Sequence, residues 1–322
     1  MGERSGAKVW AALWVVYIVW GSTYLAIRLG VRPGHGTGLP PLLLAGARFT
    51  VAGAVMLGFS VRRPSPDGRP DPLGKQQWIA AAVVGLALLL GGNGLVSVAE
   101  KRIASGVAAV VVATVPIWAA LFGALWGQER ISRHQAIGLA LGFGGVSALV
   151  IGTGGGKIDS IGVLTVLAGA LSWAGGSVWS RTAPTVRRPL VMTGMEMLCG
   201  GVGCTMVGLA IGEGGQLHLS DVPARSWLAL VYLVVFGSML GYTAYVWLLH
   251  NARLSLVTTY AYVNPLVAVA LGAIFVNEQI TLRTVLASLA IVAGVALIIT
   301  RSTSRRREVV EVEVPEPQNV VR

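Results

Sequence analysis

Charged residues are scarce in this sequence: Asp, Glu, Lys and Arg make up 12% of its 322 residues, about half the share of an ordinary soluble domain. A soluble chain of this length needs a polar surface around its core, so the scarcity excludes a soluble globular protein. Only two cysteines are present, which excludes a disulfide-stapled fold. Hydrophobic residues instead make up 54% of the chain, and 43 residues are glycine. The composition therefore indicates a polytopic membrane protein with closely packed helices.

The net charge of +11 does not indicate a nucleic-acid partner. Lys and Arg stand in short clusters between apolar runs, as the positive-inside rule describes for membrane proteins. The Pro-rich polar loop 62–76, for example, carries Arg62, Arg63, Arg69 and Lys75. This distribution predicts a multi-pass protein of the cell membrane with both termini in the cytoplasm.

Ten apolar segments are each close to the ~20 residues that cross a bilayer as a helix: 9–28, 42–61, 77–98, 105–126, 134–152, 161–180, 190–212, 226–249, 254–276 and 283–300. They are continuously apolar, unlike the alternating strands of a barrel. Residues 1–8 are expected to form a cytoplasmic N-terminus. The polar tail 301–322 is expected to be disordered and cytoplasmic, with its arginines against the lipid bilayer.

The two halves of the chain, 9–152 and 153–300, resemble each other. Three pairs of residues stand at matching places: Trp20 with Trp173, Pro116 with Pro265, and Glu129 with Glu278. Each half has five spans, an odd number, so the second half must enter the membrane in the opposite orientation. The sequence therefore predicts an all-α membrane protein of ten transmembrane helices arranged as two inverted five-helix repeats, which is a transporter architecture.

The run 19–28, VWGSTYLAIR, resembles the first helix of the EamA-type transporters of the drug/metabolite transporter superfamily. Three further stretches, 92–100, 109–116 and 260–265, are similar to those of the YedA-like exporters within it. The resemblance covers roughly residues 10–300. It implies ten helices in two EamA repeats, a central cavity and export of small metabolites, but no particular substrate.

Arg48 and Glu196 are the clearly charged residues within the predicted spans, and they occupy matching positions of the two repeats. A charge at membrane depth needs a partner or a wet cavity. We expect both to line one cavity, Arg48 toward its outer end and Glu196 toward its inner end. Glu196 is also a candidate proton acceptor, which would make protons the coupling ion. The alternative is a structural ion pair or an arginine that snorkels to the interface.

Polar and aromatic side chains recur at helical spacing on the apolar spans, where lipid cannot satisfy them. The candidate cavity residues are Trp20, Thr23, Tyr24, Asn93, Ser97, Trp118, Trp173, Ser177, Tyr242, Tyr245, Tyr260 and Asn264. Such walls suit amphipathic solutes, including amino acids with apolar side chains. The alternative is hydrogen bonding between helices. Pro116 and Pro265 each remove a backbone hydrogen bond, as hinges or as tolerated kinks.

No cofactor, metal or nucleotide site is expected. The run Gly152–Lys157 resembles a phosphate loop, but Ile151 stands where that motif needs glycine and no Ser or Thr follows Lys157. A secondary transporter of small molecules, sufficient as a monomer, is the leading interpretation. A passive channel or scaffold subunit remains open. A membrane enzyme acting on lipid-linked substrates is less favoured, because Glu129 and Glu278 are expected on opposite sides of the membrane.

Overall fold

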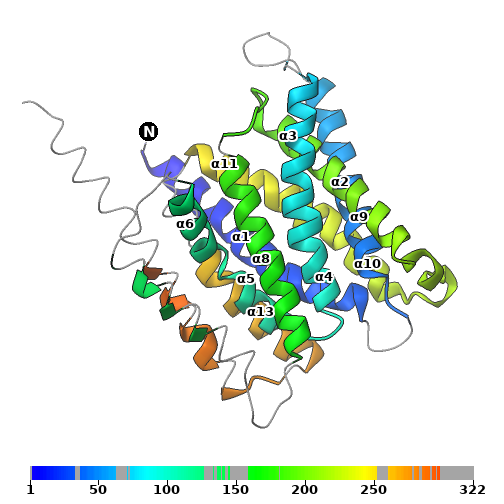
Figure 1. Ribbon diagram of the computed structural model, residues 1–322, viewed down its shortest axis with the longest axis vertical. Helices are drawn as coiled ribbons and strands as arrows, with labels where there is room; N and C mark the ends of the chain where they lie inside the picture. Colours follow the sequence, from blue (N-terminus) through cyan, green and yellow to red (C-terminus); the bar gives the residue numbers. More distant parts are fainter. Residues whose placement is uncertain are drawn as a thin grey trace, which may run out of the picture.

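The computed structural model describes residues 2–32, 37–62, 71, 73–126, 159–180, 182–251 and 260–277, with short pieces between 133 and 145 and between 279 and 297. Every regular element in these ranges is a helix, and the helices pack side by side in one bundle (Figure 1). Much of the fifth predicted span, the N-terminal part of the ninth and parts of the tenth lie outside the described residues, as do Glu129, Glu278 and the tail 301–322.

The elements follow one another as α1 (Gly2–Val31), α2 (Pro41–Arg62), α3 (Lys75–Gly85), η1 (Leu86–Gly94), α4 (Leu95–Ala99), α5 (Ser105–Val112), α6 (Val115–Leu125), α8 (Ser160–Ser180), α9 (Pro189–Ala210), η2 (Glu213–Gln216), η3 (Leu219–Asp221), α10 (Ala224–Tyr232), η4 (Leu233–Leu240), α11 (Gly241–Asn251) and α13 (Tyr260–Val276). The first helix begins at Gly2, so the segment predicted as a separate N-terminus is part of α1.

Seven helical runs within the described ranges are long and apolar enough to cross a membrane: Ala7–Val31, Pro41–Arg62, Lys75–Ala99, Ser105–Leu125, Ser160–Ser180, Pro189–Ala210 and Ala224–Tyr245. Two shorter apolar helices, Val263–Val276 and Val285–Gly294, lie within the ninth and tenth predicted spans. Seven of the predicted spans are thus confirmed as helices of membrane-crossing length.

The helices α2 and α9 pack against each other along glycines and run antiparallel. A Cβ atom on Gly53 would lie 2.5 Å from the backbone nitrogen of Leu198, and one on Gly201 would lie 2.4 Å from that of Thr50. No side chain fits there, so the two backbones touch. Gly46 and Gly194 stand seven residues before Gly53 and Gly201 and lie on the same contact faces. This close pair sets how both helices are rotated.

An acidic residue that follows each of these helices caps the N-terminus of the other. The Glu213 carboxylate accepts hydrogen bonds from the backbone N–H groups of Leu42 (3.0 Å) and Leu43 (3.0 Å) at the start of α2. The Asp71 carboxylate accepts one from the N–H of Arg188 (3.1 Å), directly before α9. Both carboxylates satisfy amides that have no partner within the helix.

Two of the membrane-crossing runs contain wide π-helical stretches. The run from Lys75 to Ala99 is π-helical over η1, and the run from Ala224 is π-helical over η4. These two stretches fall at corresponding places of the third and eighth predicted spans. Carbonyl groups of both accept bonds from neighbouring helices: Ala87 from the Ser172 hydroxyl (2.8 Å) and Gly237 from the Trp20 indole (3.2 Å).

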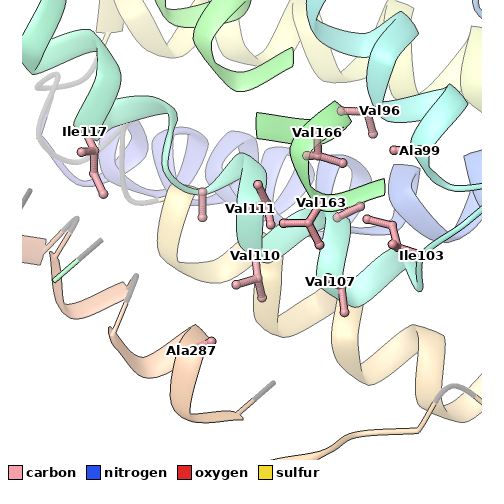
Figure 2. Close-up of a cluster of buried hydrophobic side chains, with 12 residues drawn as sticks. Val96, Ala99, Ile103, Val107, Val110, Val111, Ile117, Val163, Val166 and Ala287 are labelled. Carbon is pink, nitrogen blue, oxygen red and sulfur yellow. The ribbon is translucent and has the colours of Figure 1, made fainter. Parts of the chain in front are cut away.

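A cluster of buried apolar side chains fills the space between α4, α5 and α8 (Figure 2). Val96 and Ala99 come from α4, Val107, Val110 and Val111 from α5, and Val163 and Val166 from α8. Small and β-branched residues dominate it, so the helices approach closely. The cluster holds α5 against α8, and both helices line the candidate site.

The two predicted hinge prolines behave differently. The fourth predicted span is interrupted by a turn at residues 113–114, and Pro116 stands in the first turn of α6, where its missing N–H has no helical partner to lose. Pro265 lies inside α13, which runs through it. The helix is therefore interrupted before Pro116 but continues through Pro265, so the two prolines do not form matching breaks.

Candidate functional site

A cavity of about 100 Å³ lies between the helices. Its walls come from α1, α2, η1, α4, α5, α6, α8, α11 and α13, so both halves of the chain contribute to it. Ten of the residues that the sequence predicts for the site line it: Trp20, Thr23, Tyr24, Arg48, Asn93, Trp173, Tyr242, Tyr260, Asn264 and Pro265. The remaining predicted residues lie elsewhere.

An aromatic cluster around Trp20 forms one wall of the cavity. The Trp20 ring centroid lies 5.3 Å from that of Tyr242, 5.4 Å from that of Tyr260 and 5.0 Å from that of Tyr245. Tyr242 and Tyr260 meet it edge to face, which the charge distribution of aromatic rings favours. The cluster joins α1, α11 and α13.

Each of the two matching tryptophans lies against a glycine of the other half of the chain. A Cβ atom on Gly241 would lie 2.4 Å from Trp20 Nε1, and one on Gly92 would lie 2.7 Å from Trp173 Cε3. The absent side chains make room for the indole rings beside the π-helical stretches. The pairing of Trp20 with Trp173, made on sequence, is therefore matched by equivalent surroundings.

Arg48 is buried, with 4% of its surface exposed, and borders the cavity from α2. Its Nε donates a hydrogen bond to the Ser238 hydroxyl of η4 (2.8 Å). Gly237 leaves space beside the guanidinium, because a Cβ atom there would lie 3.1 Å from Nη2. The π-helical stretch η4 thus positions both Arg48 and Trp20.

Glu196 does not line this cavity, which corrects the expectation that it shares one with Arg48. It lines a second, smaller pocket of about 20 Å³ with residues of α3, η1 and α9. The reason is helix rotation: Gly194 faces α2, and Glu196, two residues further, therefore turns toward α3. Tyr242 borders both pockets and stands between the two charged residues.

The other predicted residues outside the lining make hydrogen bonds within their own helices or pack against neighbouring side chains. Ser97 and Ser177 donate to the carbonyl groups of Asn93 (2.9 Å) and Trp173 (2.7 Å), one turn back in their own helices. The Trp118 indole donates to the Thr114 hydroxyl (3.1 Å) and packs on α8. Tyr245 belongs to the aromatic cluster through Trp20 but is not among the residues that line the cavity. Short hydroxyl side chains on a helix commonly return to its own backbone.

Sequence reasoning missed the apolar and glycine part of the lining, which includes Ile27, Val96 and Gly169. Such residues carry no signal that separates them from lipid-facing ones. It also missed the depth of Glu100, which is fully buried. The nearby Arg28 guanidinium donates to the backbone carbonyls of Glu100 (2.6 Å) and Ile103 (2.8 Å). Asn93, Ser97 and Glu100 recur at helical spacing in the sequence, and this polar pattern was the signal that could have indicated the burial of Glu100.

Comparison with known proteins shows where this arrangement belongs. The EamA-like transporter family matches residues 9–151 and again residues 160–300. The chain belongs to the EamA-like transporter family. The "Uncharacterized inner membrane transporter YedA" of Escherichia coli (strain K12) is 38% identical over 301 residues, which are 92% of each chain. The "Uncharacterized transporter YvbV" of Bacillus subtilis (strain 168) is 27% identical, over 83% of this chain and 85% of its own.

A solved crystal structure shares the fold of this EamA chain. The two superpose with a TM-score of 0.59 over 94% of this chain and 99% of the other, at 20% sequence identity. The EamA relatives are transporters, and the cavity lies within the membrane-crossing bundle. In the residues that the structure describes, no group of three or more His, Cys, Asp or Glu side chains could hold a metal ion.

Proposed function

We propose that this chain is a ten-helix secondary transporter that exports small organic solutes by alternating access through the central cavity. The observation that carries the proposal is the cavity itself, which is walled by both halves of the chain with aromatic rings, amides and one buried arginine. A site near the middle of a bundle, at the junction of two repeats, suits a carrier whose halves rock about it.

The matching surroundings of the two halves support inverted repeats. The glycines of α2 and α9 touch as an antiparallel pair, each of these helices is capped by an acid that follows the other, and both π-helical stretches hold a neighbouring helix through a carbonyl group. Domains 9–152 and 153–300 are the proposed repeats, with both termini cytoplasmic.

Glu196 is the proposed proton carrier. In the part of the chain that the structure describes, its side chain makes neither a salt bridge nor a hydrogen bond, although it lies on a membrane-crossing helix. The titratable groups that face it are Tyr242, across the small pocket, and Cys199, one turn along α9. A carboxylate in this setting is a candidate for exchanging a proton as the pocket opens to either side.

Solute counterflow in proteoliposomes tests the proposal. The full-length protein is reconstituted and offered labelled aromatic and aliphatic amino acids and organic acids, with and without a pH gradient. We expect saturable exchange that an opposing unlabelled solute accelerates, because a carrier returns faster when loaded. A passive channel would give flux without this acceleration, and a scaffold subunit would give none.

The variant Glu196→Gln tests proton coupling. We expect the pH gradient to lose its effect while exchange at equal pH remains. Asp221→Asn is the matched control, since it makes the same chemical change at an exposed position in η3. A gradient effect that survives in Glu196→Gln would assign the coupling to another group and leave Glu196 a structural role.

A further inference from the structure

We propose that Arg48 binds a carboxylate group of the solute, with Ser238 as its positioning residue, and that the solute is an organic monoanion with an aromatic-sized apolar body. This inference rests on the proposed transport function and narrows its substrate class. It starts from the charge of Arg48, which lies in a membrane-crossing helix at the cavity wall.

The Arg48 charge has no countercharge in the described part of the structure. Its single hydrogen bond there runs from Nε to Ser238, and its Cζ lies 4.6 Å from the centre of the Phe49 ring. Arg188 differs, because a salt bridge of 2.5 Å to Asp71 neutralises it. A guanidinium has five donors, and leaving one buried without an anion is unfavourable. An anionic solute would satisfy it.

The hydrogen bond from Nε to Ser238 leaves the two Nη atoms of Arg48 to bind a carboxylate. Ser238 is fully buried and engages Nε, so it fixes the plane of the guanidinium. The Nη atoms, beside the glycine at position 237, remain as a planar pair of donors. Such a pair matches the two oxygens of a carboxylate.

The rest of the cavity favours a monoanion over a zwitterion. Its described lining contains no Asp or Glu, and its other polar side-chain groups are amides, hydroxyls and indole N–H groups. Glu100 is buried outside this lining. An ammonium group would therefore meet no countercharge, whereas the positive field of Arg48 attracts an anion. Trp20 and Trp173 supply flat apolar surfaces for the body of the solute.

Two neighbouring residues of η4 hold the two sides of the proposed binding site. Gly237 accepts the hydrogen bond of the Trp20 indole through its carbonyl group, and the next residue, Ser238, accepts that of Arg48. One turn of η4 thus holds the aromatic wall and the anion-binding group at a fixed separation. A solute that places a ring on one and a carboxylate on the other fits this arrangement.

Four probes that share a phenyl ring test the inference: 3-phenylpropionate, its neutral amide 3-phenylpropanamide, the zwitterion L-phenylalanine and the cation 2-phenylethylamine. Binding to the full-length protein in detergent is followed by thermal stabilisation, and exchange by counterflow in proteoliposomes. We expect 3-phenylpropionate to bind and exchange, and the other three to bind at least tenfold more weakly.

The variants Arg48→Gln, Arg48→Lys and Ser238→Ala assign the effect to residues. Hydrogen bonds to charged groups predict a loss of about tenfold to a hundredfold in affinity for 3-phenylpropionate in Arg48→Gln, with little change for the amide. Arg48→Lys keeps the charge without the planar fork and is expected to lose part of the preference. Ser238→Ala is expected to reduce the ratio of acid to amide binding. Thr243→Ala, an exposed hydroxyl on the next helical turn, is the control.

Each outcome separates the two proposals. If the amide binds as well as the acid, or if Arg48→Gln leaves the preference for the acid intact, the carboxylate site is wrong while the transporter stands. If the zwitterion binds as well as the acid, the preference for a monoanion is wrong while the transporter stands. If no solute of any class exchanges, the proposed function fails and this inference falls with it. Should Arg48→Gln not fold, the ratio of acid to amide binding in Arg48→Lys and Ser238→Ala decides.

Discussion

At the residue scale, three acidic residues of the described chain cap the N-termini of helices. Asp71 and Glu213 cap α9 and α2, and Asp159 caps α8. The Asp159 carboxylate accepts a hydrogen bond from the N–H of Gly162 (3.0 Å) and forms a salt bridge with Arg102 (3.1 Å). These bonds, that of Gly162 first, hold the pKa of the Asp159 carboxyl below its ordinary value of 3.8.

The variant Asp159→Asn tests this role through its pH dependence. A carboxyl whose pKa is lowered by folding stabilises the protein above its unfolded pKa, and this contribution is lost as the pH falls through the folded pKa. We therefore expect Asp159→Asn to lower the melting temperature at neutral pH, and the difference from the wild type to shrink as the pH falls below 3.8. Asp221→Asn serves as control. A difference that is constant with pH would contradict the electrostatic account.

At the element scale, the helix pair α2 and α9 is the frame on which the site is built. Their glycine contacts fix the rotation of both helices, and that rotation turns Arg48 toward η4 and Glu196 toward α3. The π-helical stretches η1 and η4 change which side chains of their own helices face α2 and α9, since a π-turn shifts the register of the side chains that follow it. Hydropathy predicted plain helices at both places, because a change from α to π alters no composition.

Substituting the contact glycines tests the frame. Gly53→Ala and Gly201→Ala would each drive a methyl group into the backbone of the partner helix. We expect each to lower the free energy of unfolding by about 1–3 kcal/mol or more, as overpacking does. Gly58→Ala is the matched control on α2, since its Cβ would meet nothing within 4 Å. Alanine favours a helix over glycine, so this variant should be neutral or slightly stabilising. Equal behaviour of all three would contradict the close contact.

At the scale of the whole molecule, the chain is an all-helical member of the EamA-like transporter family with a cavity inside its bundle. The family model matches it twice, over residues 9–151 and over residues 160–300. The proposed number of spans and the proposed orientation of the termini follow from hydropathy and from the distribution of Lys and Arg.

Reporter fusions test that topology. A fluorescent protein fused after Arg322 is expected to fluoresce in the cytoplasm. Alkaline phosphatase becomes active only after export, so it is expected to be inactive when fused after Arg322. It is expected to be active when inserted at residue 218, between α9 and α10. Even numbers of spans keep both termini on one side. Active phosphatase at the C-terminus would contradict ten spans with a cytoplasmic N-terminus.

Hydropathy and charge determined the class of this protein, because crossing a bilayer depends on the sum of side-chain transfer energies along a local segment. The match of Trp20 with Trp173 and of Arg48 with Glu196 also needed only the sequence. Tertiary structure alone decided that Arg48 faces the main cavity and Glu196 the smaller pocket, that Trp118 and Ser177 lie outside the lining, and that Gly92 and Gly237 belong beside the site. The direction of a side chain depends on how its helix is rotated, and here backbone contacts between residues far apart in the chain set that rotation.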